Sequence, residues 1–145
     1  SYLLVRLPAY AVNRSKRLIK SPRIFWGDTG VALHLGGTAP EGAHLENLLL
    51  NDLLAWRDAR VDRMELGYWR TTICEEVDFV IETGGKLLPS EVKATSQPRL
   101  ADCAHLRTFR QEYGRKARAG LLLHTGRTVE WLTPDVLAVP WWRVL

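Results

Sequence analysis

Cysteine is scarce in this 145-residue chain, which contains only Cys74 and Cys103 and no CxxC pair. Two cysteines are too few for a disulfide framework or a zinc cluster, so a reducing cytoplasm is the expected compartment. The histidines are also few and lack metal-ligand spacing. Each is therefore expected to be a surface or capping residue: His34, His44, His105 and His124.

Long apolar runs and nucleotide-binding motifs are missing as well. No uninterrupted apolar run reaches the roughly 18 residues that span a bilayer, and the leucine-rich segment 45–56 contains Glu46 and Asp52. The chain does not begin with a signal-peptide pattern. The Walker pattern GxxxxGK[ST], the nucleophile elbow and the dinucleotide fingerprint are absent. These absences argue against a membrane protein and against a P-loop nucleotide-binding protein.

The composition is that of a folded globular protein, with 46% hydrophobic and 25% charged residues. The length predicts a single domain over residues 1–145 with a sizeable core. Because the first residue is Ser1 rather than Met, we expect the chain to be a piece of something longer.

Basic residues are clustered, although the net charge is only +4. One cluster precedes the first acidic residue, Asp28, and a second runs from Arg107 to Arg118, interrupted only by Glu112. Such clusters suit phosphate backbones, while the alternative is an ordinary solvated surface. The residues expected to contact nucleic acid are Arg14, Lys16, Arg17, Lys20, Arg23, Arg99, Arg107 and Arg110.

Hydrophobic periodicity predicts an α/β or α+β domain, with helices packed across one central mixed sheet. Helices are expected over 28–35, 41–58 and from about 98 to 113. Strands are expected over 2–7, 64–71, 119–124, 128–132 and the tail 134–145, and a polar loop over 13–23. In helix 41–58, the apolar arc consists of Leu45, Leu49, Leu53 and Trp56. Asn47, Asn51 and Asp58 are expected on the opposite side of the helix, and Glu46 at the margin of the arc. A carboxylate there is costly unless something pairs with it, or it reaches solvent at the edge of the core.

The segment 75–93 predicts a β-hairpin. Val77, Phe79 and Ile81 alternate with charged residues, which indicates a strand with one apolar face. Gly84 and Gly85 allow the positive φ angles of a tight turn. With these two glycines as the loop, the numbers of opposed residues sum to 169.

This register places Asp78 opposite Glu91 and Glu76 opposite Lys93. Directly opposed carboxylates repel each other, because their Cβ atoms are only about 5 Å apart. A divalent cation such as Mg²⁺, which prefers oxygen ligands, would explain the pair. Charges on a solvated strand face are the alternative, and Pro89 could mark an edge or a bulge.

Together, Glu46 on a helix, Asp78 on a strand and the Glu91-Val92-Lys93 segment on its hairpin partner resemble the PD-(D/E)XK nuclease superfamily. The segments KSPRIFWGDTG, LENLLLNDLL, EEVDFVIE and PSEVKATS are similar to one branch of that superfamily. This branch is a domain of unknown function that follows an AAA-type ATPase module in bacterial and archaeal proteins. The chain lacks that ATPase half, and Val77 replaces the proline that often precedes the motif aspartate.

The resemblance implies a restriction-endonuclease-like fold and Mg²⁺- or Mn²⁺-dependent hydrolysis of phosphodiester bonds in nucleic acid, DNA being expected. Asp78, Glu91 and the Val92 carbonyl would hold the metal. Glu46 would hold a metal-bound water or a second ion, and Lys93 would act on the attacking water and the phosphate. The alternative is a non-catalytic nucleic-acid-binding or regulatory module of an AAA-type ATPase, or an interaction domain that docks through its C-terminal tryptophans.

Overall fold

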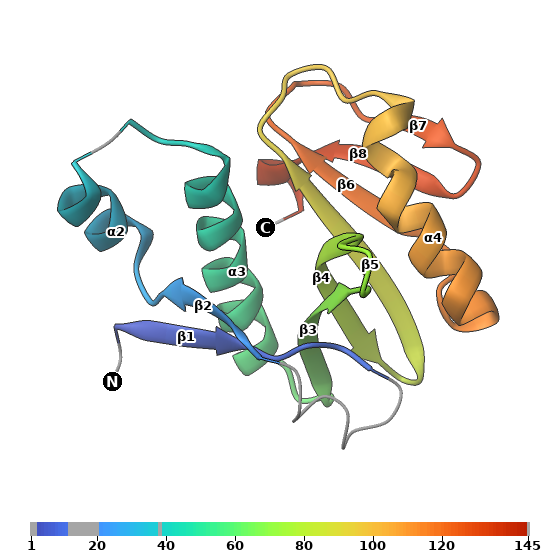
Figure 1. Cartoon of the computed structure of the whole chain (residues 1–145), viewed down its shortest axis with the longest axis horizontal. Coiled ribbons are helices and arrows are strands. Elements are labelled where there is room, and N and C mark those ends of the chain that lie inside the picture. The colour runs from blue at the N-terminus through green and yellow to red at the C-terminus, as the bar shows by residue number, and fades with distance from the viewer. Residues whose placement is uncertain (1–2, 12–20, 38, 145) are drawn as a thin grey trace.

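The main sheet of the protein is mixed and six-stranded, with the order β3-β4-β5-β6-β8-β7 (Figure 1). The structure is a computed structural model, and it describes residues 3–11, 21–37 and 39–144. β5, β6 and β8 run parallel, and the remaining neighbours pair antiparallel. Helices flank this sheet, so the predicted α+β class is confirmed. The strands are β3 (Met64–Arg70), β4 (Glu76–Thr83), β5 (Lys86–Lys93), β6 (Gly120–His124), β7 (Glu130–Thr133) and β8 (Val136–Pro140).

A separate two-stranded sheet is formed by β1 (Leu4–Leu7) and β2 (Arg23–Trp26), which pair antiparallel. The apolar run at 24–26 therefore belongs to a strand. The predicted loop over 13–23 is wrong at its end, because Arg23 begins β2 opposite Leu7. The rest of that loop over 13–20 lies outside the described residues.

Capping interactions define where the helices begin. α2 (Thr29–Gly36) starts after Asp28, whose carboxylate accepts a hydrogen bond of 2.9 Å from the Val31 N–H. α3 (Gly42–Asp58) starts after Glu41, whose N–H donates to His44 Nδ1 at 3.0 Å. A 3₁₀ turn, η1 (Leu100–Cys103), leads into α4 (Ala104–Tyr113). The predicted helices over 28–35 and 41–58 are confirmed. The third, expected from about residue 98, is confirmed in its end at Tyr113, but its first turn is 3₁₀ and its α-helical part begins at Ala104.

The C-terminal tail is less extended than predicted. β8 ends at Pro140 and is followed by a 3₁₀ turn, η3 (Trp141–Arg143), in place of a continuous strand to residue 145. A second short turn, η2 (Gly114–Lys116), follows α4. No helix in the described part of the chain is both long enough and apolar enough to cross a bilayer.

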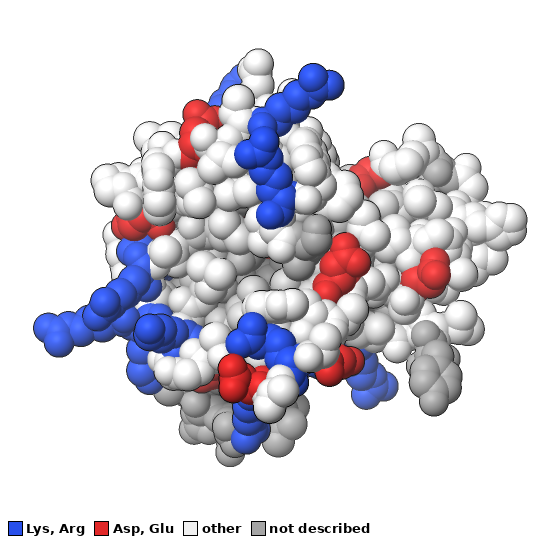
Figure 2. Space-filling view, turned by 180° about the vertical axis from the view of Figure 1, so that it is seen from behind, with Lys and Arg blue, Asp and Glu red and all other residues white. Residues whose placement is uncertain are grey.

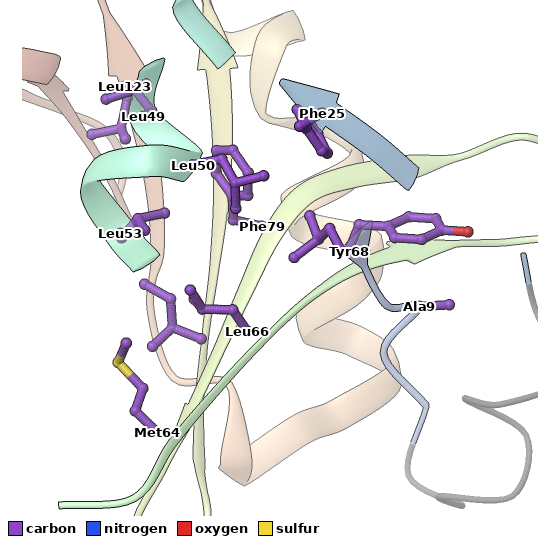
Figure 3. Close-up of a cluster of buried hydrophobic side chains, with 12 residues drawn as sticks. Ala9, Phe25, Leu49, Leu50, Leu53, Met64, Leu66, Tyr68, Phe79 and Leu123 are labelled. Atoms are coloured by element: carbon purple, nitrogen blue, oxygen red, sulfur yellow. The ribbon is translucent and has the colours of Figure 1, made fainter. Parts of the chain in front are cut away.

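The main sheet has a buried core on each face, with α3 on one side and α4 on the other (Figure 1). On the α3 side, Leu49, Leu50 and Leu53 meet Leu66 of β3 and Phe79 of β4 (Figure 3). Phe25 of β2 joins the same cluster, which ties the small sheet to the main domain. The core on the α4 side is built on Cys103, Leu106, Phe109, Val77, Val80, Leu122 and Val136.

The hairpin register is confirmed from the turn as far as Phe79 and Ser90, because Phe79 pairs with Ser90 and Thr83 with Lys86, each pair summing to 169. The pairing ends there, so the predicted pairs Asp78–Glu91 and Glu76–Lys93 lie beyond the paired part of the hairpin. Gly84 and Gly85, at φ +56° and +73°, form the turn. The prediction that β4 has a single apolar face is wrong, because Phe79 packs on the α3 side of the sheet and Val77 packs on the α4 side.

A β-bulge explains why these two residues, two positions apart, face opposite cores. Gly67 pairs with Val80 and Trp69 with Val77, so three steps along β4 match two along β3. A bulge adds one residue to one strand and breaks the alternation of its side chains. Asp78 lies inside this irregularity.

Helix α3 buries a polar residue that the pattern assigned to its outer side. Asn47 is only 5% exposed, and that prediction is wrong. Its amide accepts from the Trp26 N–H at 2.8 Å and donates to the Trp26 carbonyl and Thr29 Oγ1. Asn47 thus provides hydrogen-bond partners for the backbone N–H and carbonyl of Trp26, the last residue of β2, and joins this strand to α3. Trp56, expected on the apolar arc, is 42% exposed.

The turn after β6 depends on a glycine that has no room for a side chain. A Cβ atom on Gly126 would lie 2.1 Å from the Ser96 carbonyl oxygen and 2.8 Å from His124 Nδ1. His124 is fully buried and holds the turn through the Gly126 N–H at 2.9 Å and the Thr128 carbonyl at 3.0 Å. The turn also joins the segment after β5, because the Thr125 N–H donates to the Thr95 carbonyl.

We expect Gly126→Ala to lower the free energy of unfolding by about 2 kcal/mol or more, because overpacking against backbone is relieved only by moving it. Urea denaturation measures the change. Gly42→Ala is the control, since its Cβ would meet Ala94 Cβ at an ordinary 3.6 Å. Equal stability of Gly126→Ala and the wild type would contradict the packing described for this turn.

Candidate functional site

A cluster of charged side chains forms where α3, β2, β4 and β5 approach one another. Glu46 comes from the second turn of α3, Asp78 from the bulge in β4, and Glu91 and Lys93 from the end of β5. Arg23, the first residue of β2, lies among the carboxylates. The structure therefore brings the predicted residues Glu46, Asp78, Glu91 and Lys93 into one cluster, which also contains Arg23, a basic residue predicted for another role.

Arg23 bridges three carboxylates. Its guanidinium nitrogens lie 2.5 Å from Glu46 Oε1, 2.9 Å from Glu76 Oε1 and 3.5 Å from Asp78 Oδ1. The guanidinium carbon is also 5.1 Å from the centre of the Phe25 ring and 5.8 Å from that of Tyr68. Glu76 therefore interacts with Arg23, whereas Glu91 interacts with the ammonium of Lys93.

Asp78 connects the two strands of the hairpin through its side chain. Its Oδ2 accepts a hydrogen bond of 2.9 Å from the Val92 N–H. The backbone pairing of β4 with β5 runs from the turn as far as Phe79 and Ser90. Beyond this pair, the Val92 N–H of β5 donates to the Asp78 side chain. Bulges often redirect side chains next to functional sites. Here the bulge places Asp78 between β5 and Arg23.

Glu91 is the most deeply buried carboxylate of the cluster, with a side chain only 6% exposed. Its Oε1 lies 2.9 Å from Lys93 Nζ. Its Oε2 is buried and has no hydrogen-bond partner among the described residues. A buried acceptor of this kind is costly unless a donor or a cation meets it. An external donor or cation at Glu91 Oε2 would remove this cost.

The environment raises the pKa of all three predicted acidic residues. Burial, and then the charge of Asp78, raise the pKa of Glu46 to about 7 against the opposing effect of Arg23. Burial and Asp78 likewise raise the pKa of Glu91 to about 8 despite Lys93. Burial also raises the pKa of Asp78, and the Val92 N–H and Arg23 reduce the increase. Such shifts are typical of functional sites but also of structural ion-pair networks.

The chemistry of the donor set fits a hard divalent cation. Glu46, Asp78, Glu91 and the Val92 carbonyl offer the oxygen ligands that Mg²⁺ prefers, and Glu91 Oε2 has no partner among the described residues. The described residues do not include three His, Cys, Asp or Glu side chains already arranged to hold a metal. Arg23 and Lys93 pair with carboxylate oxygens of this donor set.

A cavity of about 460 Å³ opens beside the cluster, between β2, α2 and α3. Arg23 and Glu46 belong to its wall, together with Trp26, Leu35 and His44. A ligand in this cavity would therefore be able to reach both the guanidinium of Arg23 and the carboxylate of Glu46.

A family model described as a domain of unknown function, DUF4143, matches residues 41–144. The chain belongs to this family. Glu46, Asp78, Glu91 and Lys93 lie within the matched region, whereas Arg23 precedes it. No curated protein and no solved structure matches the chain.

The residues expected to contact nucleic acid are dispersed. Arg99 and Arg107 are exposed near and on α4. Arg110 is half-buried, forms an ion pair with Asp135 and donates to the Ala117 and Arg118 carbonyls, so it stabilises the segment between α4 and β6. Figure 2 shows basic and acidic side chains interspersed over one face of the molecule. Arg23 lies in the carboxylate cluster, paired with Glu46 and Asp78. The other four, Arg14, Lys16, Arg17 and Lys20, lie outside the described residues.

Histidines serve local structure, as the cap formed by His44 shows. His105 Nδ1 lies 3.0 Å from the Glu76 carbonyl, which links α4 to β4. His124 is neither a surface nor a helix-capping residue, so its prediction is wrong in that respect. Sequence reasoning also missed the contacts of Arg23 and Glu76 in the site. The one sequence signal for an additional basic residue in the site was the excess of acidic over basic residues in the hairpin 75–93.

The raised carboxylate pKa values predict that the metal-free protein becomes less stable as the pH rises. A pKa higher in the folded than in the unfolded state contributes stability below the unfolded value, about 4.5 for Glu, and loses it as the pH rises through the folded value. For Glu46 and Glu91 the loss extends through about pH 7 and 8. Urea denaturation in EDTA at about pH 5.5 and 8.5 tests this change.

Glu91→Gln should reduce this pH dependence, because it replaces the carboxyl group of Glu91 by an amide that does not titrate. The charged groups around this position are those of Asp78, Glu46, Glu76, Arg23 and Lys93. Glu112→Gln, on the exposed side of α4, is the matched control and should leave it unchanged. A wild-type protein that becomes more stable between these pH values would contradict the raised pKa values.

Proposed function

We propose that this DUF4143 domain is a Mg²⁺- or Mn²⁺-dependent phosphodiester hydrolase of the PD-(D/E)XK type, acting on nucleic acid. The observation that carries the proposal is the convergence of Glu46, Asp78 and Glu91, with Lys93 beside them, from one helix and two strands. The buried Oε2 of Glu91, which lacks a partner among the described residues, supports a cationic ligand. An AAA-type ATPase module as partner is part of the same proposal.

Each residue would have a distinct role. Asp78, Glu91 and the Val92 carbonyl would hold the metal, and Glu46 would orient water from α3. When bound, a divalent cation lowers the pKa of water and stabilises negative charge on a phosphoryl group. Lys93, 2.9 Å from Glu91, would position the attacking water and offset charge as it develops on the phosphate.

The second candidate is a non-catalytic nucleic-acid-binding or regulatory module. A specific observation favours it: the chain's own cations, Arg23 and Lys93, already pair with the carboxylates. A cluster neutralised in this way can be stable without metal. Cleavage therefore has to be tested separately from binding.

Replacement of Lys93 by alanine should separate chemistry from binding. We expect Lys93→Ala to lower divalent-dependent cleavage by roughly 10²–10³-fold, the typical cost of losing one electrostatic group that acts on developing charge. Metal and nucleic-acid binding should remain. Cleavage of single-stranded, duplex and branched substrates with Mg²⁺ and with Mn²⁺ measures the change. Lys86→Ala, at the other end of β5, is the matched control and should cleave as the wild type does.

Asp78→Asn should lose metal binding and cleavage together, because Asp78 is assigned to the metal itself. Calorimetric titration with Mn²⁺ measures the binding. If the wild type and Lys93→Ala are equally inert while both bind nucleic acid, the module is the correct function. If Asp78→Asn binds Mn²⁺ as tightly as the wild type, the assignment of the metal to Asp78 is wrong.

Binding to a nucleic-acid duplex should weaken steeply with salt, because it releases condensed counterions. Charge reversal at Arg99 and Arg107 should reduce the slope of log K against log salt by about 0.9 for each phosphate that the variant no longer neutralises. Arg63→Glu serves as the control, since Arg63 pairs with Glu65 at the start of β3. An unchanged slope in the Arg99 and Arg107 variants would exclude these two residues from the interface.

A further inference from the structure

Arg23 occupies a position that the proposed metal site alone does not explain. Its guanidinium interacts with Glu46 and Asp78, two of the three carboxylates assigned to the metal site. It also interacts with Glu76, which has no assigned part in the reaction. A divalent cation and the guanidinium would therefore compete for the same oxygens.

The charges of the cluster show why this competition matters. Fully ionised, Glu46, Glu76, Asp78 and Glu91 carry four negative charges, and Arg23 and Lys93 supply two positive charges. Charges brought this close in a partly buried setting interact strongly. Removal of the Arg23 charge would increase the attraction of the carboxylates for an external cation.

Arg23 also has access to a second environment. It is part of the wall of the 460 Å³ cavity, and its side chain remains 27% exposed. A guanidinium presents a planar set of donors that matches a phosphate group. A phosphate in the cavity would thus offer Arg23 an alternative partner to the carboxylates.

We propose that Arg23 couples divalent-metal binding to binding of a phosphate-containing substrate. Without substrate, Arg23 pairs with Glu46 and Asp78 and keeps metal affinity low. A substrate phosphate that pairs with the guanidinium releases these carboxylates for the metal. Because binding free energies are reciprocal, the metal must tighten substrate binding by the same factor. Arg23 is thereby a positioning residue, and this inference rests on the metal site of the proposed function.

Two features of β2 make Arg23 suited to this role. Its backbone is fixed by pairing with Leu7, so that only the side chain needs to move. The Phe25 and Tyr68 rings lie 5.1 and 5.8 Å from its guanidinium carbon and are aromatic surfaces on which a guanidinium can remain during such a movement. Tyr68 is itself held by a 2.7 Å hydrogen bond to the Ser21 carbonyl.

The test is calorimetric titration of the protein with Mg²⁺, with and without a short phosphorothioate oligonucleotide that resists cleavage. In the wild type we expect the oligonucleotide to raise metal affinity about 5-fold or more, within the usual range of coupling between sites. Arg23→Met should bind Mg²⁺ more tightly than the wild type in the absence of oligonucleotide. It should also lose most of the coupling. Titration of the oligonucleotide alone corrects for its own Mg²⁺ binding.

Arg63→Met is the matched control, because it removes a surface Arg–Glu pair and should leave both affinities unchanged. Arg23→Lys retains the charge without the planar donor set and should keep only part of the coupling. It also provides a second variant if Arg23→Met does not fold, which thermal melting in EDTA establishes.

Each outcome decides the inference. Equal coupling in the wild type and the Arg23 variants overturns it, and so does an Arg23→Met protein that binds Mg²⁺ no more tightly than the wild type. Both results leave the proposed metal site standing. Absence of Mg²⁺ binding in every protein, with or without oligonucleotide, overturns the inference and the metal site together.

Discussion

Neutralisation of a buried group of carboxylates is the constraint on which this region of the structure depends. Glu46, Asp78 and Glu91 come from three elements that must pack closely to build the core on the α3 side of the sheet. An ionised carboxylate removed from water is strongly destabilising unless it is paired or protonated. The fold meets this constraint with Arg23, Lys93, the Val92 N–H and raised carboxyl pKa values.

This constraint links the small N-terminal sheet to the site. β2 supplies Phe25 to the core and Arg23 to the carboxylates. Asn47 joins the end of the same strand to α3 one residue after Glu46. The β1–β2 sheet is therefore in direct contact with the carboxylate cluster, although its residues precede the region that matches the DUF4143 family.

Local sequence patterns were sufficient to predict much of the fold. The 3.6-residue periodicity predicted α3, and the Gly84–Gly85 turn predicted the hairpin and its register near the turn. These features depend on residues close together in the chain. The bulge at Asp78 was not predicted, because it arises from the pairing of β4 with β3 and is invisible in the alternation of β4 alone.

The candidate site was predicted in composition but not in electrostatics. Glu46, Asp78, Glu91 and Lys93 were identified from the resemblance and the hairpin, whereas Arg23 was assigned to a nucleic-acid surface. Its contact with Glu46 joins residues 23 positions apart and depends on how β2 packs against α3. A single sequence gives no register for such a contact. The burial of Asn47 was missed for the same reason.

The central claim is that the carboxylate cluster is a divalent-cation site. Its most direct test is an anomalous-difference map from crystals grown with Mn²⁺ and a phosphorothioate oligonucleotide. We predict a peak contacted by the carboxylate oxygens of Asp78 and Glu91, with the Arg23 guanidinium moved away from Asp78. A map without a peak at the cluster, with Arg23 still paired to Glu46 and Asp78, would contradict this claim.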